Sequence, residues 1–161
     1  MTKWICVVAA LLFAALEASA GDFVDEMWNS YKKEEGANVI TMGKTMLSVV
    51  FATADKETKA AIKKINKMTI VALDAGNQAI LKKVEKDLAT AEKKGAQMAG
   101  ETLDPKTNTL FKIYIVKEGE YYTHLLTYFK SNDGSKVGIV DMAGRFLESE
   151  LEALGKSSKP I

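Results

Sequence analysis

The sequence predicts an α+β domain with a mixed β-sheet of about six strands, helices packed mainly on one face, and further helices at both ends. Three observations predict this class. Apolar residues recur every three to four positions through most of residues 22–95, which is typical of amphipathic helices. Short apolar runs at residues 37–42 and 68–73 interrupt that pattern. From residue 97 onward, strand-like segments alternate with turn signals.

The first half predicts the order helix, strand, helix, helix, strand, helix. A first helix covers residues 22–35, where Phe23, Met27 and Tyr31 share one face, and residues 37–42 follow as a buried strand. A second helix opens at Gly43-Lys44, and Asp55 caps a third. The inward residues of these two helices are Met46, Leu47, Val50, Phe51, Ala61, Ile62 and Ile65.

Residues 68–73 form the second strand, and the clearest helix of the chain follows it and ends at Gly95. The apolar face of that helix carries Ile80, Leu81, Val84, Leu88 and Ala91. Two strands separated by helical segments predict a parallel pair joined by a right-handed crossover.

The second half predicts an antiparallel meander. Its strands are residues 97–103, 110–116, 121–130 and 136–142, and the connections contain Asp104-Pro105, Glu118-Gly119 and Asp133-Gly134. A last helix at residues 145–154 carries Leu147, Leu151 and Leu154 on one side. The chain therefore predicts a single domain at residues 21–155, with a flexible tail at 156–161.

The first twenty residues predict a cleavable signal peptide. Lys3 precedes an apolar run from residue 4 to residue 16, and the triplet Ala18-Ser19-Ala20 has the small-residue pattern of a cleavage site. The thirteen-residue run is shorter than the roughly 20 apolar residues that a membrane span requires. We expect a mature chain that begins at Gly21, is periplasmic or secreted, and has no stable membrane insertion.

Composition excludes several classes of function. The only cysteine, Cys6, lies in the signal peptide, so the mature chain has no disulfide, thiol nucleophile or cysteine-based zinc site. The net charge is +1, and the lysines alternate with acidic residues, which argues against nucleic-acid binding. The glycines form neither a dinucleotide fingerprint nor a P-loop, so we expect no cofactor and no metal.

The sequence resembles a family of small exported Bacteroidetes proteins classed as a domain of unknown function. The resemblance rests on an N-terminal stretch with Gly43-Lys44-Thr45-Met46-Leu47, on the lysine-rich helix and apolar strand after it, and on the closing stretch Gly138-Ile139-Val140-Asp141-Met142-Ala143-Gly144. It spans most of residues 22–155 and implies an envelope location, with no catalytic residues to transfer. Many relatives resemble lipoproteins, whereas this chain has Gly21 where the acylated cysteine would stand.

The single histidine, His124, is the first candidate functional residue. If Glu118-Gly119 forms a two-residue hairpin loop, Val116 pairs with Tyr121 and Ile113 with His124. One sheet face then carries Phe111, Ile113, Ile115, Tyr122, His124, Leu126 and Tyr128, and we expect most helices to pack there. A lone histidine on such a face is usually a hydrogen-bonded core residue. A triad of Ser48 or Ser131 with His124 and Asp141 can be written down, but no nucleophile-elbow motif supports it.

The opposite face of the meander provides the predicted binding residues. It is too apolar for a solvated face and too polar for a dry core, and it carries Leu110, Lys112, Tyr114, Val116, Tyr121, Thr123, Leu125, Thr127, Gly138, Val140 and Met142. Such a mixture is typical of a protein contact surface whose centre is apolar and whose rim stays accessible to water. We predict binding through Tyr114, Tyr121, Thr123, Leu125 and Val140. The alternative is that the first or last helix covers this face.

These observations favour a non-enzymatic binding or interaction module of the bacterial envelope. Its partner would be an envelope protein or a small hydrophobic ligand, and a homodimer is compatible with the same surface. Two alternatives remain open, namely a small cofactor-free hydrolase around His124 and a carrier of a hydrophobic small molecule beneath the helices.

Overall fold

The computed structural model describes residues 20–151, which form one six-stranded sheet flanked by helices on both sides. The strands occur in the order β1-β2-β6-β5-β4-β3. Their bounds are β1 Ala37–Gly43, β2 Ile65–Leu73, β3 Gln97–Asp104, β4 Thr109–Glu118, β5 Tyr121–Ser131 and β6 Val137–Phe146. The α+β class, the order of elements and the closing meander are confirmed. The predicted signal peptide, up to residue 19, and the predicted tail lie outside the described residues.

All neighbouring strands of the sheet are antiparallel, so the predicted parallel pair is wrong. Helices α2 (Lys44–Val50) and α3 (Lys56–Ile62) follow β1 directly. They lie at the end of the sheet where β1 stops, and Gly43 pairs with Lys67 there. The chain therefore enters β2 from the same end and runs back beside β1. Two seven-residue helices are each only about 10 Å long, too short to cross the sheet as a parallel connection requires.

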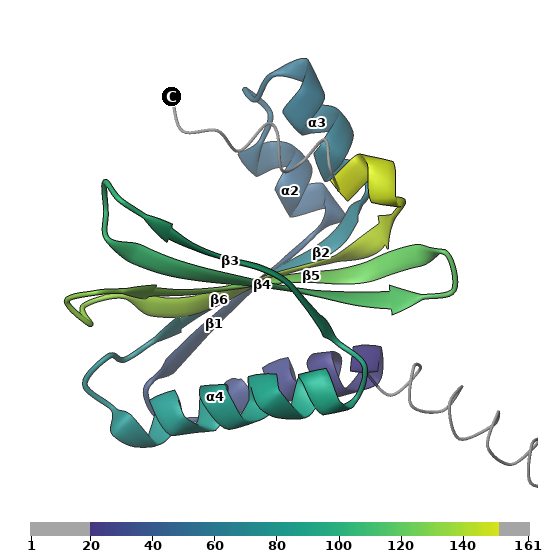
Figure 1. The fold of residues 1–161 in the computed structure, drawn as a ribbon. Coiled ribbons are helices and arrows are strands. Elements are labelled where there is room, and N and C mark those ends of the chain that lie inside the picture. Colours follow the sequence, from purple (N-terminus) through teal and green to yellow (C-terminus); the bar gives the residue numbers. More distant parts are fainter. Residues whose placement is uncertain (1–19, 152–161) are drawn as a thin grey trace, which may run out of the picture.

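Two long helices cover one face of the sheet (Figure 1). One is the N-terminal helix, residues 20–31, and the other is α4 (Gln78–Lys93), which Asn77 caps. Their buried side chains pack on the strands as the first core. The helices contribute Val24, Met27, Trp28, Tyr31, Ile80, Val84, Leu88 and Ala91 to it, and the sheet contributes Val71, Tyr114, Val116, Leu126 and Ile139 among others. The predicted apolar faces of both helices are thus confirmed at Met27, Tyr31, Ile80, Val84, Leu88 and Ala91.

A second core lies on the other side of the sheet, beneath α2 and α3. Its buried residues are Met42, Leu47, Ile62, Ile65, Met68 and Phe146. Asp55 caps α3 as predicted, because its carboxylate accepts a hydrogen bond of 2.7 Å from the backbone N–H of Thr58. The predicted inward face of α2 is wrong at Met46 and Val50, whose side chains are 54% and 53% exposed. This helix has only about two turns at the end of the sheet, and it buries only Leu47.

The β4–β5 hairpin has a different register from the predicted one. Glu118 pairs with Tyr121 across a loop of Gly119 and Glu120, and Gly119 has the left-handed backbone that such a loop requires (φ 64°). A bulge follows, so Val116 pairs with His124 and not with Tyr121. The shift is an odd number of residues, and it therefore moves β5 side chains to the other face relative to β4.

The register change reverses the predicted assignment of faces for β4, whereas His124, Leu126 and Tyr128 of β5 lie on the helix-covered face as predicted. His124, Leu126 and Tyr128 share a face with Tyr114 and Val116 and lie under the long helices. The two long helices therefore cover the face opposite to the one that carries Phe111, Ile113 and Ile115. Strand β6 also extends through Arg145 and Phe146, and the last helix begins at residue 148 in place of 145.

Candidate functional site

On the face of the sheet opposite the two long helices, β4 and β5 carry apolar side chains that pack against neither core. We call this surface the open face, and it consists of Phe111, Ile113, Ile115, Leu125, Thr127 and Phe129. All six side chains are half-buried, and none is charged. They form three cross-strand pairs, with Phe111 opposite Phe129, Ile113 opposite Thr127 and Ile115 opposite Leu125. Helices α2 and α3 lie at one end of β1 and β2 (Figure 1), and none of the six side chains belongs to the core beneath them or to the first core.

The neighbouring strands continue the open face without adding charge at its centre. Gly138 of β6 pairs with Phe129, whose ring lies so close that a Cβ at Gly138 would come within 2.6 Å of it. Gly100 and Thr102 of β3 pair with Ile113 and Phe111. Ile40, on the same side of the sheet in β1, is 50% exposed. The open face is therefore the middle of a broader uncharged surface.

The structure separates the five predicted binding residues into three environments. Leu125 belongs to the open face, and Val140 borders it where β6 meets the second core. Tyr114 is 4% exposed beneath the long helices. Tyr121 lies on the opposite side from Leu125, where the Arg145 guanidinium stacks 4.2 Å from the ring centroid. Thr123 sits in the β5 bulge and donates a hydrogen bond of 3.5 Å to the carbonyl of Val116. Only Leu125 and Val140 share one surface, and their binding role stays a prediction.

His124 belongs to a buried hydrogen-bonded cluster beneath the N-terminal helix. Its Nδ1 lies 3.1 Å from each carboxylate oxygen of Asp141, and the indole N–H of Trp28 donates to Asp141 Oδ2 at 2.7 Å. Asp141 is fully buried, and His124 and Trp28 are 5% and 3% exposed. A carboxylate buried this deeply is stable only when it is paired. The cluster thus ties the N-terminal helix to the centre of the sheet.

The environment of His124 favours its charged form. Burial alone would lower the pKa of His124, but the hydrogen bond and the charge of Asp141 outweigh that effect and raise the pKa above its ordinary value of 6.5. Asp25 of the N-terminal helix raises the pKa further, and Lys67 of β2, which pairs with Asp25 at 3.2 Å, opposes it. The Asp141 carboxylate therefore favours the protonated, cationic form of His124.

The serines considered for a triad lie elsewhere in the described structure. Ser131 is seven residues further along β5, about 24 Å from His124 along an extended strand. Its hydroxyl donates to Asp133 at 2.6 Å in the β5–β6 turn. Ser48 is on α2 and donates to the carbonyl of Lys44. The histidine and aspartate of the triad are thus together, without either serine, and a functional role for His124 stays a prediction.

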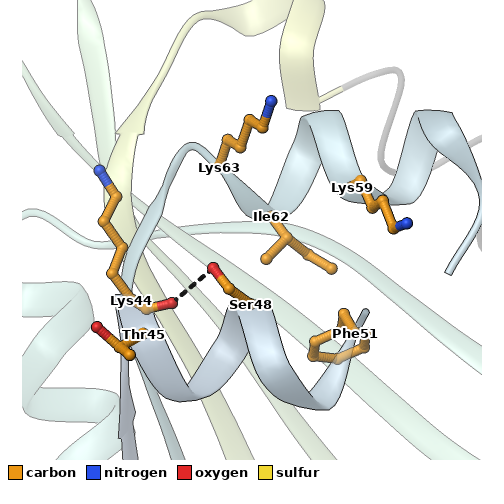
Figure 2. A pocket seen from close by; sticks show the side chains of 7 residues that line it. All are labelled: Lys44, Thr45, Ser48, Phe51, Lys59, Ile62 and Lys63. Carbon is orange, nitrogen blue, oxygen red and sulfur yellow. Dashed lines mark hydrogen bonds between the residues drawn. The ribbon is translucent and has the colours of Figure 1, made fainter. Parts of the chain in front are cut away.

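A pocket of about 570 Å³ lies between α2 and α3 (Figure 2). Phe51 and Ile62 lie between the two helices and form its apolar part. The side chains around them are polar or cationic, namely Lys44, Thr45, Ser48, Lys59 and Lys63. This combination differs from the open face, because here cations and hydroxyl groups border the apolar surface.

Comparison with known proteins identifies the family. Residues 31–154 match the family described as Domain of unknown function (DUF4252). The chain belongs to this family. The DUF4252 match includes the whole sheet, α2, α3 and α4, and it begins at Tyr31, the last residue of the N-terminal helix. No curated protein and no solved structure gives a significant match.

No group of three or more histidine, cysteine, aspartate or glutamate side chains within residues 20–151 could hold a metal ion. No helix in the same range is long and apolar enough to cross a membrane.

Sequence reasoning placed Leu125 and Thr127 on the predicted contact surface of this DUF4252 domain, but it missed the β4 half of the open face and the pocket. It assigned Phe111, Ile113 and Ile115 to the helix-covered face, because the hairpin bulge leaves no trace in the pattern of apolar residues. It also interpreted the lysines of α3 as an ordinary solvated face. A signal for the pocket was present in Phe51 and Ile62, which lie next to Lys59 and Lys63 once α2 and α3 form a hairpin.

Proposed function

We propose that this DUF4252 domain is an exported, non-enzymatic interaction module whose contact surface is the open face. The observation that carries the proposal is the set of large apolar side chains on β4 and β5 that belong to neither core and that no helix within residues 20–151 covers. The largest apolar patch on a soluble domain is often the surface where another molecule binds. Export is supported by the apolar run and the triplet Ala18-Ser19-Ala20, and N-terminal sequencing of the native protein tests it. Residues 1–20 still attached would contradict export with cleavage.

The occupant that fits the open face best is a second copy of this chain. The face has no charged side chain, so two copies meet without like-charge repulsion and without unpaired buried charges. A two-fold axis would place the same residues opposite one another, as in most homodimers. Two sheets stacked face to face lie about 10 Å apart, which the Phe111 and Phe129 rings can fill.

The size of the open face predicts a weak dimer. Together with the flanking residues of β3 and β6, the open face spans four strands about 4.8 Å apart and five residues rising about 3.4 Å each, or about 330 Å² in projection. That area is within the range of the largest apolar patch on a typical monomer, about 300–600 Å², and such a patch is often functional. It is less than the roughly 800 Å² that each partner contributes to a standard interface. We therefore expect association that depends on protein concentration.

The sharpest test is Thr127→Glu in the chain that begins at Gly21. Thr127 is in the centre of the open face, so the change adds a charge there without removing an apolar side chain. The matched control is Thr53→Glu, which adds the same charge to the exposed loop between α2 and α3. Sedimentation equilibrium over a range of concentrations should show dimers for the wild type and for the control, and only monomers for Thr127→Glu.

Three results would count against this proposal. A wild type that stays monomeric at every concentration rejects the second copy as occupant. Dimers that persist in Thr127→Glu show that the contact lies elsewhere. Equal loss of dimers in Thr53→Glu shows that net charge, and not the open face, controls association.

A further inference from the structure

We propose that the pocket between α2 and α3 binds a single-chain anionic amphiphile, with the acyl chain against Phe51 and Ile62 and the anionic head among the lysines. This site is separate from the open face, and it does not depend on self-association. The inference rests on the pocket's shape, its charge and the order in which apolar and cationic groups line it.

The apolar part of the pocket is an extension of the second core that remains accessible. Ile62 is 9% exposed and belongs to that core, and Phe51 is half-buried and packs against it. Both side chains lie in the space between α2 and α3 (Figure 2). A volume of about 570 Å³ is within the usual range of small-molecule sites, about 300–1,000 Å³. An acyl chain entering here would bury its apolar surface against both side chains.

The positive charge around the pocket favours a bound amphiphile with an anionic head group. Lys44, Lys59 and Lys63 line the pocket, and none of them has an acidic partner within 4.0 Å among the described residues. Residues 44–64 contain five lysines, one aspartate and one glutamate, a net charge of +3 in a chain whose total is +1. The remainder of the chain is therefore −2. Glu150 pairs with Lys64 at 3.0 Å and offsets one of the positive charges, so the α2–α3 hairpin keeps a net positive charge. An anion is attracted to this hairpin.

Hydroxyl groups complete the polar side of the pocket. Thr45 and Ser48 lie on the α2 wall next to Lys44, and Ser48 already donates to the carbonyl of Lys44 at 3.0 Å. Because the Ser48 hydrogen is already used, the Thr45 hydroxyl and the lysine ammonium groups are the donors that match the acceptor oxygens of a carboxylate. The site thus fits a fatty acid better than a neutral lipid of the same length.

The probe for the test is decanoate, titrated into the chain that begins at Gly21 by isothermal titration calorimetry and followed by backbone amide NMR. We expect saturable binding, with shifts at Ser48, Phe51 and Ile62, and weaker binding at high salt because ions screen exposed charges. The double variant Lys59→Gln with Lys63→Gln should bind about 3- to 30-fold more weakly, from the usual strength of exposed charge pairs. The matched control is Lys82→Gln with Lys86→Gln, two exposed lysines of α4 outside the pocket.

A further variant, a neutral probe and lipid vesicles give results that could reject the proposal. Ser48→Glu, at an exposed position of α2, should also weaken binding, because it places a negative charge at the head-group site. Binding of 1-decanol as tight as that of decanoate would reject the charge selection. Equal affinity in the Lys59/Lys63 variant would reject the pocket. Binding to phosphatidylglycerol vesicles without binding to monomeric decanoate would show a membrane surface to be the ligand and overturn the proposal.

Discussion

Replacing Asp141 with alanine should be among the most destabilising changes in the domain. The carboxylate of Asp141 is the acceptor for both Trp28 and His124, and all three side chains are buried. Without it, the indole N–H of Trp28 and Nδ1 of His124 lose their partners. A buried polar group without a partner costs about 1–3 kcal/mol, so two give about 4 kcal/mol, in agreement with about 3–5 kcal/mol for a broken buried ion pair.

This cost converts to a large shift of the melting temperature. The entropy of unfolding for a domain of about 130 residues is about 0.28 kcal/mol/K near the midpoint, so about 4 kcal/mol lowers Tm by about 14 °C. Differential scanning calorimetry of the chain that begins at Gly21 measures the shift. A loss of less than about 3 °C would refute the reasoning, because it would mean that water or a rearranged side chain replaces the carboxylate at little cost.

Asp141→Asn isolates the charge from the hydrogen bond, because the amide oxygen still accepts from Trp28. In the wild type the pKa of His124 is raised above 6.5. The pair therefore contributes its full stability below pH 6.5 and loses it as pH rises through the raised pKa. In the variant, burial is left to dominate and should lower the pKa of His124 below 6.5. That protein should lose stability as pH falls.

The difference in unfolding free energy between wild type and Asp141→Asn should therefore grow from pH 9 to pH 6. Urea unfolding at several pH values, followed by circular dichroism, measures this difference, and the effects of other titrating groups cancel in it. His124→Gln is the control, because it removes the titrating imidazole and should flatten the pH dependence. A difference that stays constant or shrinks as pH falls would show that the Asp141 charge does not hold the proton on His124.

Three further predictions concern the burial of Tyr114, the close packing around Gly138 and the titration of Tyr31. Tyr114→Ala should lower stability by about 3–5 kcal/mol in a thermal melt, because its side chain is 4% exposed in the first core, whereas Tyr121→Ala should change Tm little. Gly138→Ala should cost about 1–3 kcal/mol in chemical unfolding, since its Cβ would come within 2.7 Å of the Val71 carbonyl, and Gly100→Ala, which meets nothing within 4 Å, is the matched control. The pKa of Tyr31 is raised by burial and by its hydrogen bond of 2.9 Å to Asp87, so Tyr31→Phe should leave the ultraviolet absorbance change near pH 10 unaltered. A smaller change in that variant would show that Tyr31 titrates like an exposed tyrosine.

Local signals in the sequence were reliable where a short-range interaction decides the structure. The Asp55 cap depends only on the residues that begin α3, and the apolar face of α4 repeats over four turns. The turns at Asp104-Pro105 and Asp133-Gly134 also stand where predicted. Each of these features follows from interactions between residues close together in the chain.

The β4–β5 register could not be predicted, because both faces of these strands are apolar. Alternation normally fixes the register, since a slip would bury polar residues and expose apolar ones. In β4 and β5, a shift of register by one residue turns one group of apolar side chains away from the helices and brings another apolar group to them. The bulge opposite Val116 and Lys117 therefore decided which set meets the helices, and with it the candidate site.

The sequence by itself determined which segments become helices and strands, because periodicity, caps and turn residues act within a few positions of one another. Only the tertiary structure decided that β6 enters between β2 and β5, that β1 and β2 are antiparallel, and that Phe111 and Phe129 remain uncovered. Those features depend on which surfaces the helices reach after the sheet forms. That choice is set by packing between residues distant in the chain, such as Trp28 with Asp141, and no local pattern encodes it.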